Sequence, residues 1–141
     1  MKKFVIAAHG HFADGILSSL RMILGTIDGI ETMNAFVDED FDIAASVRDC
    51  VQSVKESDEL IVLTDMFGGS VNNEFMRYIG RRNYHLIAGI NLPILLELVA
   101  NRDADTKDMI EGTLCSAGDS LQYCNAAFAR FRADAADDAQ L

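Results

Sequence analysis

The sequence predicts an α/β fold, with a doubly wound, mainly parallel sheet that carries helices on both faces. One reason is that apolar runs of strand length alternate with segments of helical periodicity, which is the pattern of a parallel sheet. A second reason is that the connections between these segments are short. The third is size, because 141 residues, of which 50% are hydrophobic, suit one domain with a substantial core.

The first predicted strand covers residues 4–8, and all of its side chains are apolar. This fits a strand that is buried on both faces, because a half-solvated strand alternates apolar and polar residues. His9 and Gly10 follow the strand directly. The next segment, residues 16–24, carries a helical apolar stripe and ends at Gly25, which we expect to be its C-terminal cap.

The second and third units repeat this order of strand, loop and helix. Residues 30–37 form a weaker strand candidate, and after an acidic loop Asp42 is the expected N-cap of a helix at residues 43–54. Residues 60–63 form the clearest central strand. Because parallel strands end at the same edge of a sheet, Asp65 should lie at the edge where His9 lies.

The helix of the third unit begins after a glycine-rich turn. Gly68 and Gly69 precede Ser70, which is the expected N-cap of a helix that ends at Gly80. Residues 84–90 form the next strand. Proline in the segment that follows suits the first turn of another helix.

The C-terminal part of the sequence is less regular. Residues 109–118 are compatible with a helix. In residues 121–131 apolar side chains recur at intervals of three or four, so this stretch either continues the helix or contains a short edge strand. Residues 133–141 consist mostly of alanine and aspartate, and we expect them to form a disordered tail because they offer too little apolar surface to pack.

Charge and cysteine content limit the classes of function. The formal net charge of −10 argues against nucleic-acid binding, which needs basic residues to contact phosphates, and it favours a basic protein partner. Cys50, Cys115 and Cys124 are odd in number and lack CxxC spacing, which indicates reduced thiols in a cytoplasmic protein. The first apolar run stops at His9, too early for a signal peptide or a membrane span, so we expect a soluble protein.

The pairing of His9 with Asp65 predicts a chemical role for the histidine. Taken alone, a histidine at a strand end more often only hydrogen-bonds to the backbone. A neighbouring carboxylate, however, fixes the tautomer of the ring and leaves its other nitrogen nucleophilic at neutral pH. Because no GxSxG elbow marks a serine nucleophile, His9 itself is the candidate nucleophile.

The loop of Gly68, Gly69 and Ser70 supplies a component that phosphoryl chemistry requires. Exposed amides at a helix start bind anions, and several such contacts together hold a phosphoryl group without a metal ion. We therefore predict that His9 and Asp65 are catalytic, and that this loop binds the phosphoryl group together with Gly10.

Three segments of the chain resemble the mannose-type enzyme IIA components of the bacterial sugar phosphotransferase system. These segments are residues 8–13 (AHGHFA), residues 63–70 (LTDMFGGS) and residues 88–93 (AGINLP). They occur in the order and spacing of the family, and the resemblance covers residues 1–132 as one IIA domain.

The resemblance implies that His9 accepts a phosphoryl group from the phosphocarrier protein HPr and passes it to a IIB component. Sugar uptake would then proceed through the membrane permease components IIC and IID, with no cofactor on this chain. Asp65 would orient His9, and Ser70 with its neighbouring amides would bind the phosphoryl group. Phe12 and the loop residues Met66 and Phe67 are the expected contacts for partner proteins.

The family also implies a cytoplasmic homodimer in which a C-terminal antiparallel strand joins the sheet of the partner. Residues 121–131 would then contain an edge strand. One position departs from the family, because Val71 stands where proline is common. Valine does not have the fixed φ of proline, but it has the backbone amide donor that proline lacks. We therefore expect anion binding to survive, while the rigidity of the loop is in question.

Two other functions fit parts of the sequence. One is a regulatory domain that accepts a phosphoryl group as a signal and is not coupled to sugar transport, since a fold does not fix a function. The other, which is less favoured, is a metal-dependent hydrolase in which His9 and His11 hold an ion with Asp65 or Asp14. Such a site needs several converging ligands and an open coordination position.

Overall fold

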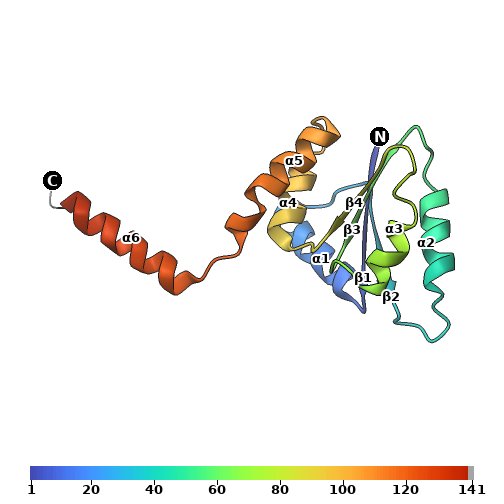
Figure 1. Ribbon diagram of the computed structural model, residues 1–141, viewed down its shortest axis with the longest axis horizontal. Helices are drawn as coiled ribbons and strands as arrows, with labels where there is room; N and C mark the ends of the chain where they lie inside the picture. Colours follow the sequence, from blue (N-terminus) through green and yellow to red (C-terminus); the bar gives the residue numbers. More distant parts are fainter. Residues whose placement is uncertain (140–141) are drawn as a thin grey trace.

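The sheet of the computed structural model is parallel throughout, and helices cover both of its faces (Figure 1). The structure describes residues 1–139. The strands are β1 (Lys2–His9), β2 (Ile30–Ala35), β3 (Glu59–Thr64) and β4 (Tyr84–Ala88). Their order in the sheet is β2-β1-β3-β4, so β1 and β3 are the two inner strands. The predicted doubly wound α/β fold is confirmed.

Two groups of helices divide the core between the two faces of the sheet. Helices α1 (Phe12–Leu24), α4 (Leu92–Ala100) and α5 (Thr106–Ser116) lie on one face, and α2 (Ile43–Gln52) and α3 (Ser70–Met76) lie on the other (Figure 1). Along β1, side chains alternate between these two cores, with Phe4 and Ile6 in the first and Val5 and Ala7 in the second. This double burial explains why β1 is apolar without alternation.

The connections of the two inner strands diverge at their carboxyl ends. β1 leads into α1 on one face of the sheet, whereas β3 leads into α3 on the opposite face. A crevice forms between neighbouring strands whose connections part in this way, and it is where ligands bind in open α/β sheets. His9 ends β1 and Asp65 follows β3, so both residues lie at this crevice.

Local signals in the sequence set several helix boundaries as expected. The side chain of Asp42 accepts a hydrogen bond from the amide three residues further on, at 3.1 Å, and thereby caps α2. Asn91, which was not predicted to be a cap, caps α4 in the same way at 2.9 Å. Gly25 follows α1 with a φ of 79°, a left-handed value that glycine adopts without strain.

The C-terminal segment differs from the expectation. A short 3₁₀ helix (Ala117–Ser120) leads to helix α6 (Cys124–Ala139), which extends away from the sheet where we expected an antiparallel edge strand and then a disordered tail (Figure 1). Most side chains of α6 that the structure describes are exposed, so local propensity decides its conformation, and its frequent alanines favour a helix. Residues 140–141 of the expected tail lie outside the described residues. Within those residues, no helix combines the length and the hydropathy needed to cross a membrane.

The three cysteines are expected to differ in reactivity. Burial raises the pKa of the Cys50 thiol to about 11, and the nearby ammonium of Lys3 offsets this only in part, whereas Cys115 and Cys124 are exposed. Because the thiolate is the reactive form, we expect Cys115 and Cys124 to react with iodoacetamide near pH 8 at least about 100-fold faster than Cys50. Mass spectrometry over a time course measures this, and all three thiols should react alike in urea. Equal rates in the folded protein would contradict the burial of Cys50.

Candidate functional site

His9 and Asp65 meet at the carboxyl ends of the inner strands. Nδ1 of His9 lies 2.8 Å from Oδ2 of Asp65, and the same oxygen accepts a hydrogen bond from the backbone amide of His9 at 3.0 Å. The other carboxylate oxygen accepts from the amide of Met66 at 3.0 Å. One carboxylate therefore holds both the backbone and the ring of His9. When Nδ1 donates to it, Nε2 keeps its lone pair.

The charge of Asp65 follows from these contacts. Burial raises the pKa of Asp65, but the hydrogen bonds from the amide and ring of His9, together with the attraction of the imidazolium charge, outweigh it. The pKa of this carboxyl therefore lies below its usual value of 3.8. At neutral pH Asp65 is an ionised acceptor, as the orientation of a neighbouring histidine requires.

Asp65 is expected to stabilise the fold only while it is ionised. Because its pKa is lower in the folded than in the unfolded chain, its contribution is complete above about pH 4 and is lost as the pH falls through the folded-state pKa. The free energy of unfolding should therefore fall more steeply below pH 4 in the wild type than in Asp65→Asn. Urea denaturation at a series of pH values measures both slopes, and Asp40→Asn, which alters an exposed loop residue, should keep the wild-type slope. Parallel profiles of the wild type and Asp65→Asn would contradict the prediction.

Ser70 lies at the other nitrogen of the imidazole. Its Oγ is 3.2 Å from Nε2 of His9. The expectation that Ser70 caps α3 is wrong, because the helix begins at Ser70 and Gly69 occupies the cap position. The serine side chain makes no capping bond, and its hydroxyl faces the histidine instead.

The two residues before Ser70 are glycines for different structural reasons. Gly68 has a φ of 81°, a left-handed value that strains other residues. Gly69 is needed for space, since a Cβ atom there would lie 3.4 Å from Cε1 of His9 and 2.8 Å from Cγ of Met66. Together they let the backbone of the loop pass directly beside the imidazole. Gly10, with a φ of 60°, turns the chain immediately after His9.

Polar contacts behind the loop were not expected from the sequence. Thr64 donates from Oγ1 to Oδ1 of Asn72 at 2.8 Å, and both residues are buried. Asn73 donates from Nδ2 to the carbonyl oxygen of Gly68 at 3.1 Å. These bonds join the end of β3 and the loop to α3 around the fully buried Val71, and they restrain the segment in which the family commonly has proline.

Phe36 is a further residue of the site that the sequence did not single out. Its ring centroid lies 5.6 Å from that of the His9 imidazole, with 30° between the ring planes. It follows β2, which lies beside β1 in the sheet. Finding Phe36 required the strand order, and the sequence alone does not state which strands are neighbours.

The three residues predicted to meet partner proteins lie on the surface. Phe12 is 45% exposed, Met66 is 54% exposed and Phe67 is 81% exposed. Phe12 lines an apolar groove between the start of α1 and the residues that lead into α4. Phe67 lies beside the outer edge of β4, in a groove that it shares with Ile110 and Leu114 of α5.

His11 and Asp14 do not join His9. The Asp14 carboxylate accepts hydrogen bonds from Oγ1 of Thr32 and Nδ2 of Asn34, each at 2.6 Å. His11 is exposed at the start of α1. Among residues 1–139, no three His, Cys, Asp or Glu side chains converge in the manner of a metal site. The hydrolase alternative therefore lacks the ligand set on which it depends.

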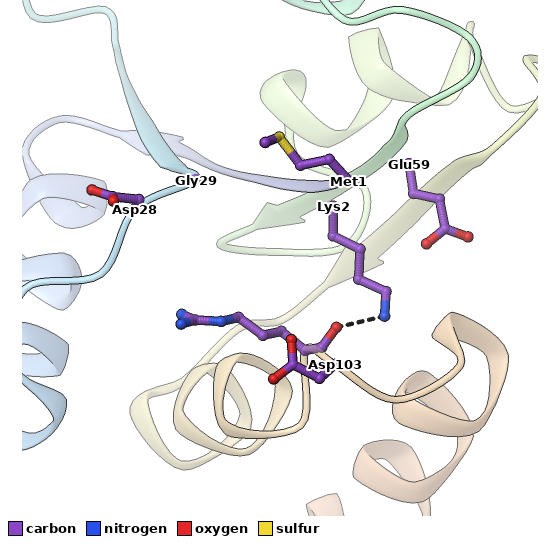
Figure 2. A pocket seen from close by; sticks show the side chains of 7 residues that line it. Met1, Lys2, Asp28, Gly29, Glu59 and Asp103 are labelled. Carbon is purple, nitrogen blue, oxygen red and sulfur yellow. Dashed lines mark hydrogen bonds between the residues drawn. The ribbon is translucent and has the colours of Figure 1, made fainter.

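A polar cavity lies at the opposite end of the strands from His9 (Figure 2). The ammonium of Lys2 closes one side of it by donating to the carbonyl oxygen of Arg102 at 2.6 Å. Its lining mixes acidic and basic side chains from the amino ends of β1 and β3, and comprises Met1, Lys2, Asp28, Gly29, Glu59, Arg102 and Asp103. This cavity takes no part in the His9 site.

Comparison with known sequences agrees with the geometry of the site. A family model described as "PTS system fructose IIA component" matches residues 3–113. The chain is 27% identical over 128 residues to the PTS system fructose-specific EIIA component of Bacillus subtilis (strain 168), and the match covers 89% of this chain and 88% of that protein. It is also 27% identical over 103 residues to the PTS system mannose-specific EIIAB component of Escherichia coli (strain K12). This match covers 72% of this chain and 32% of that longer protein.

Solved structures show the same relationship. A crystal structure from Klebsiella pneumoniae, assigned to the phosphoenolpyruvate-dependent sugar phosphotransferase system, is 41% identical with a TM-score of 0.87, and covers 90% of this chain and 93% of that one. The phosphotransferase system component EIIA from Streptococcus agalactiae is 28% identical with a TM-score of 0.76, covering 89% of this chain and 99% of that one. The chain belongs to the fructose IIA component family of the sugar phosphotransferase system, a family of phosphotransferase components.

Proposed function

We propose that this chain is a protein-histidine phosphotransferase, which accepts a phosphoryl group from HPr on Nε2 of His9 and passes it to a IIB component for sugar uptake and phosphorylation. The observation that carries the proposal is the 2.8 Å contact between Nδ1 of His9 and Asp65, which leaves Nε2 as the nucleophilic nitrogen. The family membership supplies the type of reaction.

The first transfer needs no group beyond those of the two proteins. The lone pair on Nε2 of His9 attacks the phosphorus of the phosphohistidine of HPr. A new N–P bond forms as the donor's N–P bond breaks, and the electron pair of the broken bond returns to the donor imidazole. The Nδ1 proton stays on His9, and the negative charge of Asp65 offsets the positive charge that the ring gains. Transfer to the IIB histidine repeats these steps with His9 as the donor.

In this proposal the residues around Nε2 hold the phosphoryl group. The hydroxyl of Ser70, which is 3.2 Å from Nε2, turns to a phosphoryl oxygen when the group is attached. The backbone amide of Gly68 is a further candidate donor. The amides of Gly10 and Gly69 already donate to the carbonyl oxygens of Ala35 at 2.9 Å and Met66 at 3.3 Å, so they would have to leave these partners to bind the group. Such amide contacts hold an anion without a metal ion.

The surface around the site suits protein partners in the cytoplasm. Phe12, Met66 and Phe67 expose apolar area for HPr and the IIB component, and the net charge of −10 favours a basic partner. The IIB component would deliver the phosphoryl group to the sugar at the IIC and IID permease. We also propose a homodimer in which a second copy covers the outer edge of β4, because within residues 1–139 this strand pairs only with β3.

The test uses the purified chain with phosphorylated HPr, followed by a IIB component. We expect one acid-labile, base-stable phosphoryl group per chain, which disappears when IIB is added. Unphosphorylated HPr serves as the control. Failure of phosphorylated HPr to label the chain would overturn the proposal. A label that no IIB component removes would favour the regulatory phospho-acceptor domain.

A further inference from the structure

The backbone of Phe36 is in the left-handed region, with a φ of 64°. Among residues 1–139, Asn83 is the other non-glycine residue in this region, with a φ of 55°. Asparagine tolerates the conformation, whereas a bulky aromatic residue there is an outlier. Such outliers persist where the surrounding structure imposes them, and they cluster at functional sites.

This conformation directs the Phe36 ring onto His9. The ring centroids are 5.6 Å apart, and the Phe41 ring packs edge-to-face with Phe36, with centroids 5.2 Å apart. The backbones are also joined, because the amide of Gly10 donates to the carbonyl oxygen of Ala35 at 2.9 Å. The residue before Phe36 is thus tied to the residue after His9.

Packing of the core does not account for this arrangement. The Phe36 side chain is 49% exposed, so much of its apolar surface remains in water. Asp65 and Ser70 contact the two ring nitrogens of His9, and Phe36 covers the ring itself. Hydrogen bonds at the two ring nitrogens still allow the imidazole to tilt. Phe36 is therefore placed to restrict this tilting.

The face of an aromatic ring also attracts a cation whose centre lies within about 6 Å. The His9 ring becomes cationic when Nε2 carries a phosphoryl group and Nδ1 keeps its proton. At a centroid distance of 5.6 Å, the Phe36 ring is close enough to stabilise this charge.

We propose that Phe36 is a positioning residue for His9, which holds the imidazole so that Nε2 faces the incoming phosphorus. The inference rests on the proposed transfer through His9. Phe36 touches neither the phosphoryl group nor the carrier in this role, and acts through the histidine ring.

Steady-state transfer from phosphorylated HPr tests the proposal. Phe36→Leu keeps an apolar side chain but removes the ring, and we expect kcat to fall at least about 10-fold with KM for HPr nearly unchanged. Phe36→Tyr restores a ring and should stay within about 2-fold of the wild type. If Phe36 instead only docks the carrier, Phe36→Leu will raise KM and leave kcat unchanged, which would overturn the proposal.

Proton NMR of the unphosphorylated protein gives a readout that does not depend on HPr. The ring current of Phe36 should shift the carbon-bound ring protons of His9, so these resonances should move in Phe36→Leu and stay in place in Phe36→Tyr. Unmoved resonances in Phe36→Leu would overturn the contact. If wild type takes up no phosphoryl group while the resonances do move, the proposed function fails and the ring contact stands.

A glycine variant separates positioning from packing and remains informative if Phe36→Leu folds poorly. Phe36→Gly removes the ring and relaxes the left-handed backbone, so we expect slower transfer with no loss of thermal stability. A parallel loss of stability and activity would assign Phe36 a packing role. Asn83→Gly is the matched control, because it alters a left-handed residue at the amino end of β4 and should keep the wild-type transfer rate.

Discussion

His9→Gln is expected to abolish phosphorylation of this chain by phosphorylated HPr, with a loss of at least about 10⁴-fold in rate. Glutamine retains hydrogen-bonding groups near Asp65 but has no ring nitrogen whose lone pair can form the N–P bond. The measurement is incorporation of an acid-labile label, with circular dichroism to verify the fold. Because the His9 side chain lies at the edge of the sheet and is 42% exposed, the substitution should leave the core intact.

The other two histidines provide matched controls for this experiment. His11 is exposed at the start of α1, and His85 is half-buried on β4. His11→Gln and His85→Gln should both take up label at the wild-type rate. Label retained by His9→Gln, or lost in either control, would show that the phosphoryl group is carried elsewhere.

Asp65→Ala should slow phosphorylation by about 10²–10⁴-fold while the fold persists. The variant loses both hydrogen bonds to His9, so the ring is no longer held with its proton on Nδ1. It also loses the negative charge that offsets the cationic ring during transfer. Rapid-quench measurement of label uptake gives the rate, and Asp28→Ala, at an exposed site near the amino ends of the strands, is the control.

A second variant at this position distinguishes charge from anchoring. Asp65→Asn can still accept the hydrogen bond from the His9 amide, but it has no charge and does not enforce the same tautomer. We expect it to be nearly as slow as Asp65→Ala. A rate close to that of the wild type in Asp65→Asn would assign Asp65 an anchoring role only, and a wild-type rate in Asp65→Ala would remove its role altogether.

The parts of the fold and site that could be predicted are those that short stretches of sequence determine. The runs that became β1 and β3 are apolar on both faces, and this pattern predicted strands that are buried on both faces without knowledge of their neighbours. Because parallel strands end at one edge, the positions of His9 and Asp65 in the chain predicted that both lie at the same edge of the sheet, and the pairing of β1 with β3 brings them into contact. Caps such as Asp42 are equally local, since their partners lie within one turn.

The remaining features depend on contacts that sequence does not display. Phe36 reaches His9 only because β2 is the neighbour of β1, and the hydroxyl of Ser70 had two competing partners, the helix start and the imidazole. In α6 the prediction failed for the opposite reason. That segment makes little contact with the domain, so the intrinsic preference of its alanines decided the outcome where we had expected a strand and a tail.

The hydrogen bonds between His9 and Asp65 join residues that are 56 positions apart in the chain. His9 leaves the ribosome early, whereas the carboxylate that orients it follows only after β2, α2 and β3 have been made. In the proposed function, His9 would therefore become a competent nucleophile only when β1 and β3 pair, a long-range step that closes a large loop. If His9 is the acceptor, nascent or partly unfolded chains should be poor phosphoryl acceptors, and uptake of the phosphoryl group would then report that β1 and β3 have paired.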